Sequence, residues 1–292
     1  MSLGDGLPVA VLGVLNVSPE SFHAGSVRAT DDDLLQAALA MAEAGAALID
    51  VGARSTAPYL DTDISDAEER DRLARAVEML ARKVEVPICA DTSRPGPARA
   101  ALEAGARVIN DVTGLRDPRV AALVREHGAG VILMASPLSP EATGLGRALG
   151  PEPDPVAAVR GLLAVALGRA REAGIPEERV VLDPGIGFFR DEAIPWDEWD
   201  VRVLAGLEAL GALGRPLCVG VSRKSFVGAI TGHPWTEARL AGSLAAATVA
   251  VLGGAALLRT HDVAETRDAI RIAERIRRAT MARAMDSEGA DR

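Results

Sequence analysis

Aromatic residues and cysteines are both scarce in this sequence. Trp, Tyr and Phe together make up 3% of the 292 residues, so the core must be built from Ala, Val, Leu and Ile. The two cysteines, Cys89 and Cys218, each fall inside an apolar segment that reads as a strand. Two buried thiols in a chain of this length argue against a disulfide framework and favour a reducing compartment, so we expect a cytoplasmic protein.

Long apolar runs and an excess of positive charge are also missing. No apolar run reaches about 18 residues without a charge or a helix breaker, so the sequence predicts no membrane span. The opening residues MSLGDG have neither the basic nor the apolar region of a signal peptide, so we expect none. The net charge of −9 argues against a general nucleic-acid or anionic-membrane surface. An anionic substrate would need a local cluster of Arg and Lys.

Eight short apolar segments alternate with Ala-rich, helix-like segments, and each one ends at or near polar residues. The apolar segments cover residues 9–17, 48–52, 87–92, 108–111, 131–136, 180–187, 217–224 and 256–262. This pattern predicts an α/β fold, a single-domain (β/α)8 TIM barrel over residues 1–285, with residues 286–292 as a disordered tail. In such a barrel the C-terminal ends of all the strands meet at one active site.

Two carboxylates and an amide stand at the ends of three of these segments, namely Asp91, Asn110 and Asp183. Buried carboxylates are unfavourable unless they have partners, and a ligand with N–H donors would supply them. Each Asp could instead cap a loop, since Asp before Pro-Gly, as at Asp183, is common turn chemistry. Because all three residues come at strand ends, we favour a binding site for a flat heterocycle with several ring N–H groups.

A cationic cluster follows the last two strands. Ser222, Arg223 and Lys224 come at the end of the seventh, and Arg259 and His261 at the end of the eighth. Loops after strands seven and eight often form the phosphate site of TIM barrels, and Arg and Lys bind phosphate oxygens well. Surface ion pairing is the alternative. Both groups directly follow apolar strands, which favours an anion site.

Two further features belong to loops on the same face of the predicted barrel. Asn16 ends the first strand, where its amide could hold a phosphate oxygen or a metal-bound water. Residues 137–155 contain five prolines and three glycines. This segment is either an ordered surface loop or a lid over the site, because the loops that follow the strands border the active face.

Five segments together resemble the dihydropteroate synthases, a group of pterin-binding barrel enzymes. They are LNVSPESF (15–22), DTSRPGPARAALEAGARVINDVTGL (91–115), LDPGIGF (182–188), GVSRKSF (220–226) and RTHDV (259–263). The resemblance covers nearly the whole chain, and each segment comes at the end of its own predicted strand. It implies a transferase that joins a 7,8-dihydropterin-6-methyl pyrophosphate to 4-aminobenzoate and releases pyrophosphate, in folate biosynthesis.

The resemblance implies a pterin pocket made from four residues. Asp91, Asn110 and Asp183 would hydrogen-bond the ring, and Lys224 would contact its oxygen and N5 edge. Departure of pyrophosphate leaves positive charge on the methylene carbon, and Asp91 would stabilise that cation. Preorganised charges of this kind act most strongly in a site shielded from water.

The resemblance also implies an anion site beside the pterin. Asn16, Arg259 and His261 would bind the pyrophosphate, with Mg2+ as the cofactor next to Asn16. Ser222 and Arg223 would lie near the aminobenzoate. The remaining member of the implied substrate-binding set is Thr56. Asp91, Lys224, Arg259 and His261 would be the catalytic residues, and the family commonly forms homodimers.

The sequence departs from the family pattern in the first two loops that follow strands. Ala24 stands where the family has Asp, Arg54 where it has an acid, and Ala57 where it has Arg. After the fifth strand, Ala135 takes the place of a frequent His. The pterin and phosphate motifs are retained while the loops around the aminobenzoate are altered, so a related amine could be the acceptor.

Two other functions share the carboxylate-and-amide pocket. One is a pterin-dependent methyltransferase module that passes a methyl group to a corrinoid protein, and the other is a pterin binder without catalysis. A methyltransferase has no pyrophosphate to hold, so it has little need for Ser-Arg-Lys at the seventh strand and Arg-x-His at the eighth. The presence of both motifs favours the synthase reaction.

Overall fold

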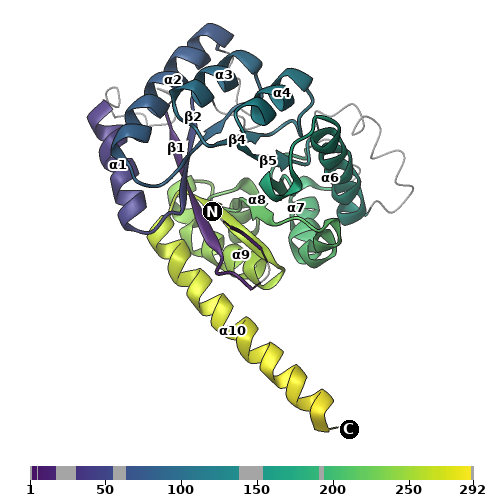
Figure 1. Ribbon diagram of the computed structural model, residues 1–292. Helices are drawn as coiled ribbons and strands as arrows, with labels where there is room; N and C mark the ends of the chain where they lie inside the picture. Colours follow the sequence, from purple (N-terminus) through teal and green to yellow (C-terminus); the bar gives the residue numbers. More distant parts are fainter. Residues whose placement is uncertain are drawn as a thin grey trace.

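The computed structural model describes residues 2–4, 6–17, 31–54, 64–137, 154–190 and 194–290, with side chains to Thr280. Within these residues, eight parallel strands close into a barrel in chain order (Figure 1). The strands are β1 (Ala10–Asn16), β2 (Leu48–Gly52), β3 (Ile88–Asp91), β4 (Val108–Asp111), β5 (Gly130–Met134), β6 (Val180–Asp183), β7 (Leu217–Val219) and β8 (Ala255–Thr260). The predicted TIM barrel is confirmed.

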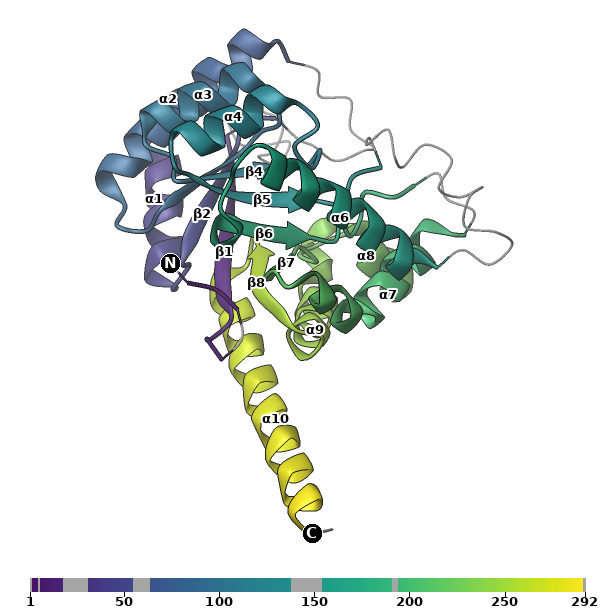
Figure 2. The same ribbon diagram turned by 45° about the vertical axis from the view of Figure 1, so that its right-hand side comes forward.

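Helices surround the strands on the outside of the barrel (Figures 1 and 2). The α-helices are α1 (Asp31–Glu43), α2 (Asp66–Lys83), α3 (Pro95–Ala104), α4 (Pro118–Glu126), α6 (Pro155–Glu172), α7 (Trp196–Ala205), α8 (Ser225–Thr231), α9 (Leu240–Leu252) and α10 (Val263–Ala290). Short 3-10 helices are η2 (Glu177–Arg179), η3 (Leu207–Leu213) and η4 (Thr236–Arg239).

Local sequence determines where several helices begin. Ser65 precedes α2, and its Oγ accepts the backbone N–H of Glu68 at 3.2 Å. Asp154 caps α6 by accepting the N–H groups of Val156 and Ala157 at 2.9 and 3.2 Å. These side chains satisfy N–H groups that have no partner inside the helix.

The interior of the barrel explains why polar residues gather at one mouth. A layer of buried apolar side chains fills it, namely Leu12, Leu48, Cys89, Ile132, Cys218 and Leu257, and both cysteines are free thiols. Side chains alternate along a strand, so residues two positions further on point the same way. Asp50, Asp91 and Arg259 occupy these next positions on β2, β3 and β8.

Helix α10 is longer than the sequence predicted. It continues to Ala290 and projects well beyond the barrel (Figures 1 and 2), so residues 286–290 are helical where a disordered tail was expected. The run from Ala279 to Met285 is rich in Ala, Met and Arg, which favour helix, and no Gly or Pro interrupts the helix before Gly289. Over the described residues, no helix has both the length and the apolarity to cross a membrane.

Candidate active site

Three carboxylates and an amide line the mouth of the barrel. Asp50, Asp91, Asn110 and Asp183 come from β2, β3, β4 and β6, and all four are buried. Parallel pairing places Asp91 next to Asn110 in register. Asn110 donates from Nδ2 to Oδ2 of Asp50 at 3.2 Å. The three residues expected from the sequence therefore lie at one mouth, together with Asp50, the polar residue of the second apolar segment, to which no role was assigned from the sequence.

Arg259 joins the cationic strand β8 to these acids. Its Nε donates to Oδ2 of Asp50 at 2.6 Å, and its Nη2 donates to Oδ2 of Asp91 at 2.9 Å. Burial lowers the pKa of Arg259, but the carboxylates of Asp50 and Asp91 more than offset this and raise it above its ordinary value. The guanidinium is thus a permanent positive charge held between two acids.

The acids at the mouth have more acceptor capacity than the described residues satisfy. Burial, and then the charge of Asp50, raise the pKa of Asp91 to about 7, although Arg259 acts in the opposite direction. Oδ1 of Asp50 and Oδ1 of Asp91 are buried and have no hydrogen-bond partner among the described residues. A buried acceptor without a partner is unfavourable by about 1–3 kcal/mol, so a ligand that presents N–H donors would bind favourably here.

Lys224 and Asp183 belong to the same site. Oδ1 of Asp183 accepts the N–H of Gly185 at 2.8 Å. Burial raises the pKa of Asp183, and the Gly185 hydrogen bond and the Lys224 charge oppose that shift. Burial, and then the charge of Arg259, lower the pKa of Lys224 to about 8, while Asp183 raises it. The charges of Asp183 on β6 and Arg259 on β8 therefore both act on the ammonium of Lys224.

The loops after β7 and β8 are tied together by side chains. Oγ of Ser222 lies 3.0 Å from Nδ1 of His261 and accepts the backbone N–H of the same residue at 3.2 Å. Arg223 donates from Nε and Nη2 to the two carboxylate oxygens of Asp262 at 2.9 and 2.6 Å. Its guanidinium is thus engaged in bracing the two loops, and its implied contact with aminobenzoate stays a prediction.

Arg223 is also held by its backbone. Its φ of 56° lies in the left-handed region, which residues other than glycine seldom adopt. Its N–H donates to Oγ of Ser243 at 2.8 Å, and its carbonyl accepts from Nη1 of Arg239 at 3.1 Å. These contacts fix the direction in which Ser222 and Lys224 leave the loop.

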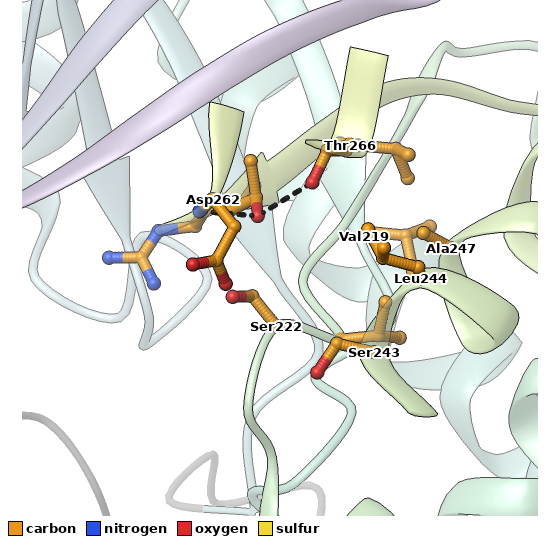
Figure 3. A pocket seen from close by; sticks show the side chains of 11 residues that line it. Val219, Ser222, Ser243, Leu244, Ala247, Asp262 and Thr266 are labelled. Carbon is orange, nitrogen blue, oxygen red and sulfur yellow. Dashed lines mark hydrogen bonds between the residues drawn. The ribbon is translucent and has the colours of Figure 1, made fainter. Parts of the chain in front are cut away.

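A small cavity lies behind these loops, between the barrel and α9 and α10 (Figure 3). Ser222, Ser243 and Asp262 line it, together with Thr260 and Thr266, whose hydroxyl oxygens lie 2.9 Å apart. Its volume of about 10 Å³ has room for no more than one water. The cavity is a packing gap behind the site and cannot take a substrate.

Asn16 ends β1 close to Asp91, the one acid of β3. A methyl group built on Gly52 would lie 3.5 Å from Oδ1 of Asn16 and 3.8 Å from Oδ2 of Asp91. An amide oxygen and a carboxylate oxygen thus lie within 3.8 Å of one point beside Gly52, and the same Oδ2 of Asp91 also accepts from Arg259. Hard oxygen donors of this kind suit Mg2+ that keeps most of its ligands as water or phosphate.

A buried ion-pair network stands behind Asp91 and was not foreseen. Glu69 of α2 is fully buried, and its carboxylate accepts from Oγ1 of Thr92 at 2.5 Å and Nη1 of Arg94 at 3.1 Å. Nε of Arg54 lies 3.5 Å from the same carboxylate. Arg54 lowers the pKa of Asp91, so the unusual arginine of the second loop acts electrostatically on the site.

Several expectations fall outside the described residues. Thr56, Ala24 and Ala57 belong to this group, and so does almost all of the proposed lid at 137–155. Ala135 is described, and its buried N–H donates to the carbonyl of Asp183 at 2.8 Å.

Asp50 stands among the polar residues of the apolar segments in the sequence, but the sequence gives it no role. It lies two residues after Leu48 in an apolar strand. Its side chain therefore points to the same side of the sheet as Leu48, toward the inside of the barrel. By contrast, no local signal identifies Glu69, because it lies in a charged helical segment that also contains Asp66 and Glu68.

Comparison with known proteins agrees with this geometry. The family model described as pterin binding enzyme matches residues 12–261. The chain is 37% identical over 265 residues to a dihydropteroate synthase of Escherichia coli, covering 90% of each chain. It is 35% identical over 254 residues to one from Synechocystis, covering 87% of this chain and 85% of that relative.

Solved structures of dihydropteroate synthases have the same fold as this chain. A Xanthomonas albilineans dihydropteroate synthase with 4-aminobenzoic acid superposes with a TM-score of 0.81 at 36% identity, over 92% of this chain and 93% of that one. A dihydropteroate synthase from Clostridium difficile in the presence of pteroic acid gives 0.83 at 30% identity, over 94% and 98%. The chain belongs to the pterin-binding enzyme family, within its dihydropteroate synthase group.

Proposed function

We propose that this protein joins a 7,8-dihydropterin-6-methyl pyrophosphate to 4-aminobenzoate and releases pyrophosphate. The observation that carries the proposal is the placement of Arg259, a fixed cation, against buried acids that have acceptor oxygens to spare. A pterin supplies ring N–H donors for those oxygens, and a diphosphate supplies the anion for the cation.

The acids and the amide would orient the pterin ring. Asp183 and Asn110 border the mouth from β6 and β4, and Lys224 stands beside Asp183. A ring whose N–H groups bond these acceptors, and whose carbonyl faces the ammonium, is fixed in one orientation. Its methylene carbon then lies near Asp91, whose ionised carboxylate stabilises positive charge on that carbon.

The transfer exchanges one bond for another. The bond between the methylene carbon and the diphosphate oxygen breaks, and the electron pair leaves with pyrophosphate. Arg259 and His261 stabilise the departing anion, and Ser222 orients the ring of His261 through its contact with Nδ1. The amine nitrogen then bonds to the carbon and loses a proton to water.

Asn16 would hold Mg2+ at the diphosphate. The oxygens of Asn16 and Asp91 that lie within 3.8 Å of one point beside Gly52 suit an ion that takes its other ligands from phosphate and water. When bound, the ion would neutralise charge on the leaving group. We expect Asn16→Ala to raise the Mg2+ concentration needed for binding of inorganic pyrophosphate, measured by calorimetry.

Direct assay tests the proposal. The purified protein, the dihydropterin pyrophosphate, 4-aminobenzoate and Mg2+ should yield 7,8-dihydropteroate and an equal amount of pyrophosphate. Lys224→Ala should reduce turnover strongly, whereas Lys83→Ala should not, because Lys83 is exposed at the end of α2. Binding of the pterin with no release of pyrophosphate would refute the synthase reaction and leave a pterin binder.

The acceptor needs its own comparison, because the second loop carries Arg54. The assay should be repeated with aniline, 4-hydroxybenzoate and 4-aminobenzoate at equal concentrations. Preference for 4-aminobenzoate supports the stated acceptor, while faster pyrophosphate release with another nucleophile would replace it.

A homodimer completes the proposal. Large apolar side chains are exposed along α8, the loop after it and α9: Ile230, Trp235, Val249 and Leu252, with Trp235 74% exposed. Burial of these side chains against a second copy would remove them from water. Sedimentation should show a dimer for the unaltered protein and a monomer for Trp235→Glu combined with Val249→Glu.

We place the protein in the cytoplasm, because its two thiols are free and buried. Protein purified without reductant should therefore show two reactive thiols per chain once it is unfolded. A disulfide or a modified thiol would count against this location.

A further inference from the structure

Helix α7 docks onto the segment after β6 through one aromatic face. The guanidinium carbon of Arg190 lies 4.2 Å from the ring centre of Trp196, and Phe189 stacks on Trp199 with ring centres 5.0 Å apart. Aromatic residues are scarce in this chain, with three Trp, one Tyr and four Phe, yet four of them fall within residues 188–199. Half of the aromatic residues of the chain therefore lie where α7 packs against the segment after β6.

A buried carboxylate stands on the same face of α7. Asp200 is fully buried, one residue after Trp199, and its Oδ1 accepts the N–H of Gly187 at 2.7 Å. Its Oδ2 is buried without a hydrogen-bond partner among the described residues. The aromatic stacking gives no reason for an acid in this position, since burying a carboxylate is unfavourable.

Gly187, whose N–H bonds Asp200, belongs to a turn that packs against Lys224. Residues Gly185–Phe188 form a turn, closed by the N–H of Phe188 on the carbonyl of Gly185 at 3.1 Å. Gly187 has a φ of 87°, and a Cβ there would lie 2.9 Å from Cδ of Lys224. The ammonium of Lys224 lies 4.6 Å from the ring centre of Phe188. The turn thus borders the outer part of the lysine side chain, from Cδ to the ammonium.

Charges from four elements act on the ammonium of Lys224. Arg259 of β8 and Arg190 after β6 lower its pKa, while Asp183 of β6 and Asp200 of α7 raise it. Burial raises the pKa of Asp200 itself to about 6, so this carboxylate is ionised for the most part at neutral pH. Removal of its charge would therefore leave Lys224 with two cations and one acid around it.

We propose that Asp200 is a positioning residue for Lys224: it anchors the turn that borders the lysine and places a second carboxylate near the ammonium. This inference rests on the proposed function, in which the protonated lysine faces the pterin carbonyl. Asp200 itself lies outside the barrel and touches no substrate in this scheme.

The test compares two substitutions of Asp200 with a control on the same helix. Asp200→Asn keeps an oxygen for the Gly187 N–H but removes the charge, and Asp200→Leu removes both. Glu198→Gln removes one exposed negative charge from α7, where Glu198 pairs with Arg202. For each protein, kcat/KM for the dihydropterin pyrophosphate and its binding by calorimetry are measured from pH 6 to pH 10.

In Asp200→Asn the alkaline limb of the kcat/KM profile should move to lower pH by roughly half a unit to one unit, with little change in kcat/KM at the optimal pH. Asp200→Leu should in addition lower kcat/KM about tenfold or more, because the turn loses its anchor. Glu198→Gln should match the unaltered protein. An unchanged alkaline limb in Asp200→Asn, or an equal shift in Glu198→Gln, would overturn the inference.

The two proposals fail separately. If the unaltered protein makes no dihydropteroate, the proposed function is wrong, and the binding curves still decide whether Asp200 sets the protonation of Lys224. If the unaltered protein is active and both curves of Asp200→Asn match it, only the role of Asp200 is wrong.

Discussion

Nε of Arg259 lies 2.6 Å from Oδ2 of Asp50, although 209 residues separate the two along the chain. The same oxygen of Asp50 accepts from Asn110, and Nη2 of Arg259 bonds Asp91. Asp50 thus aligns the cation of β8 with the amide of β4. A diphosphate that takes Nη2 from Asp91 would still find the guanidinium held in place through Nε.

The first prediction concerns this contact. Asp50→Ala should lower kcat/KM by ten- to a hundredfold, a loss of about 1.4–2.7 kcal/mol in transition-state stabilisation, because Arg259 loses the partner that orients it. Urea unfolding should show a loss of about 1–3 kcal/mol, because Arg259 and Asn110 each lose the acceptor that Asp50 provides. Asp31→Ala removes an exposed partner of Arg75 and should change stability by less than about 1 kcal/mol. Equal effects of the two substitutions would contradict this role of Asp50.

The second prediction is a bell-shaped pH dependence of kcat/KM. Asp91 acts as the anion, and its pKa is raised to about 7, so activity should be lost as the pH falls through that value. Lys224 acts as the cation, and its pKa is lowered to about 8, so activity should be lost as the pH rises through it. The maximum should therefore lie between these two values. An acidic limb at pH 4 to 5, where an ordinary Asp titrates, would show that Asp91 is not the group responsible.

The third prediction concerns two glycines in different surroundings. Gly187→Ala should reduce turnover and destabilise the protein, because the residue has a φ of 87° and its Cβ would press on Lys224. Gly161→Ala is the control, since it lies on the exposed side of α6 and its Cβ would meet nothing within 4 Å. That substitution should leave activity unchanged and stabilise the helix by up to about 1 kcal/mol. Full activity in Gly187→Ala would show that the turn does not constrain the lysine.

The fourth prediction concerns Arg54. Because its charge lowers the pKa of Asp91, Arg54→Ala should move the acidic limb of kcat/KM to higher pH. Arg82→Ala removes an exposed arginine at the other end of α2, where it pairs with Glu78, and should not move that limb. If Arg54→Ala changes only the KM for 4-aminobenzoate, the arginine acts on the acceptor and has no influence on Asp91.

The sequence by itself determined the barrel and most of the polar residues at its mouth. Alternation of apolar segments with helical ones implies parallel strands, whose C-terminal ends all lie at the same mouth of the barrel. The polar residues found at those ends are therefore expected together there: Asp91, Asn110, Asp183, Lys224 and Arg259. The local sequence sufficed for this prediction, because the polar residue at the end of each strand can be recognised without knowing which strands are its neighbours. The end of α10 was misjudged, because polar composition near Asp286 outweighed the helix-favouring residues before it.

Only the tertiary structure decided which side chains meet. The hydrogen bonds of Arg259 with Asp50, the burial of Glu69 behind Asp91 and the contact between Asp200 and Gly187 all join residues from different elements. Their charges and pKa values depend on distances across the barrel and on how much water the packing excludes. Neither quantity is written in the local sequence, because burial and long-range contact arise only when the eight strands and their helices close on one another.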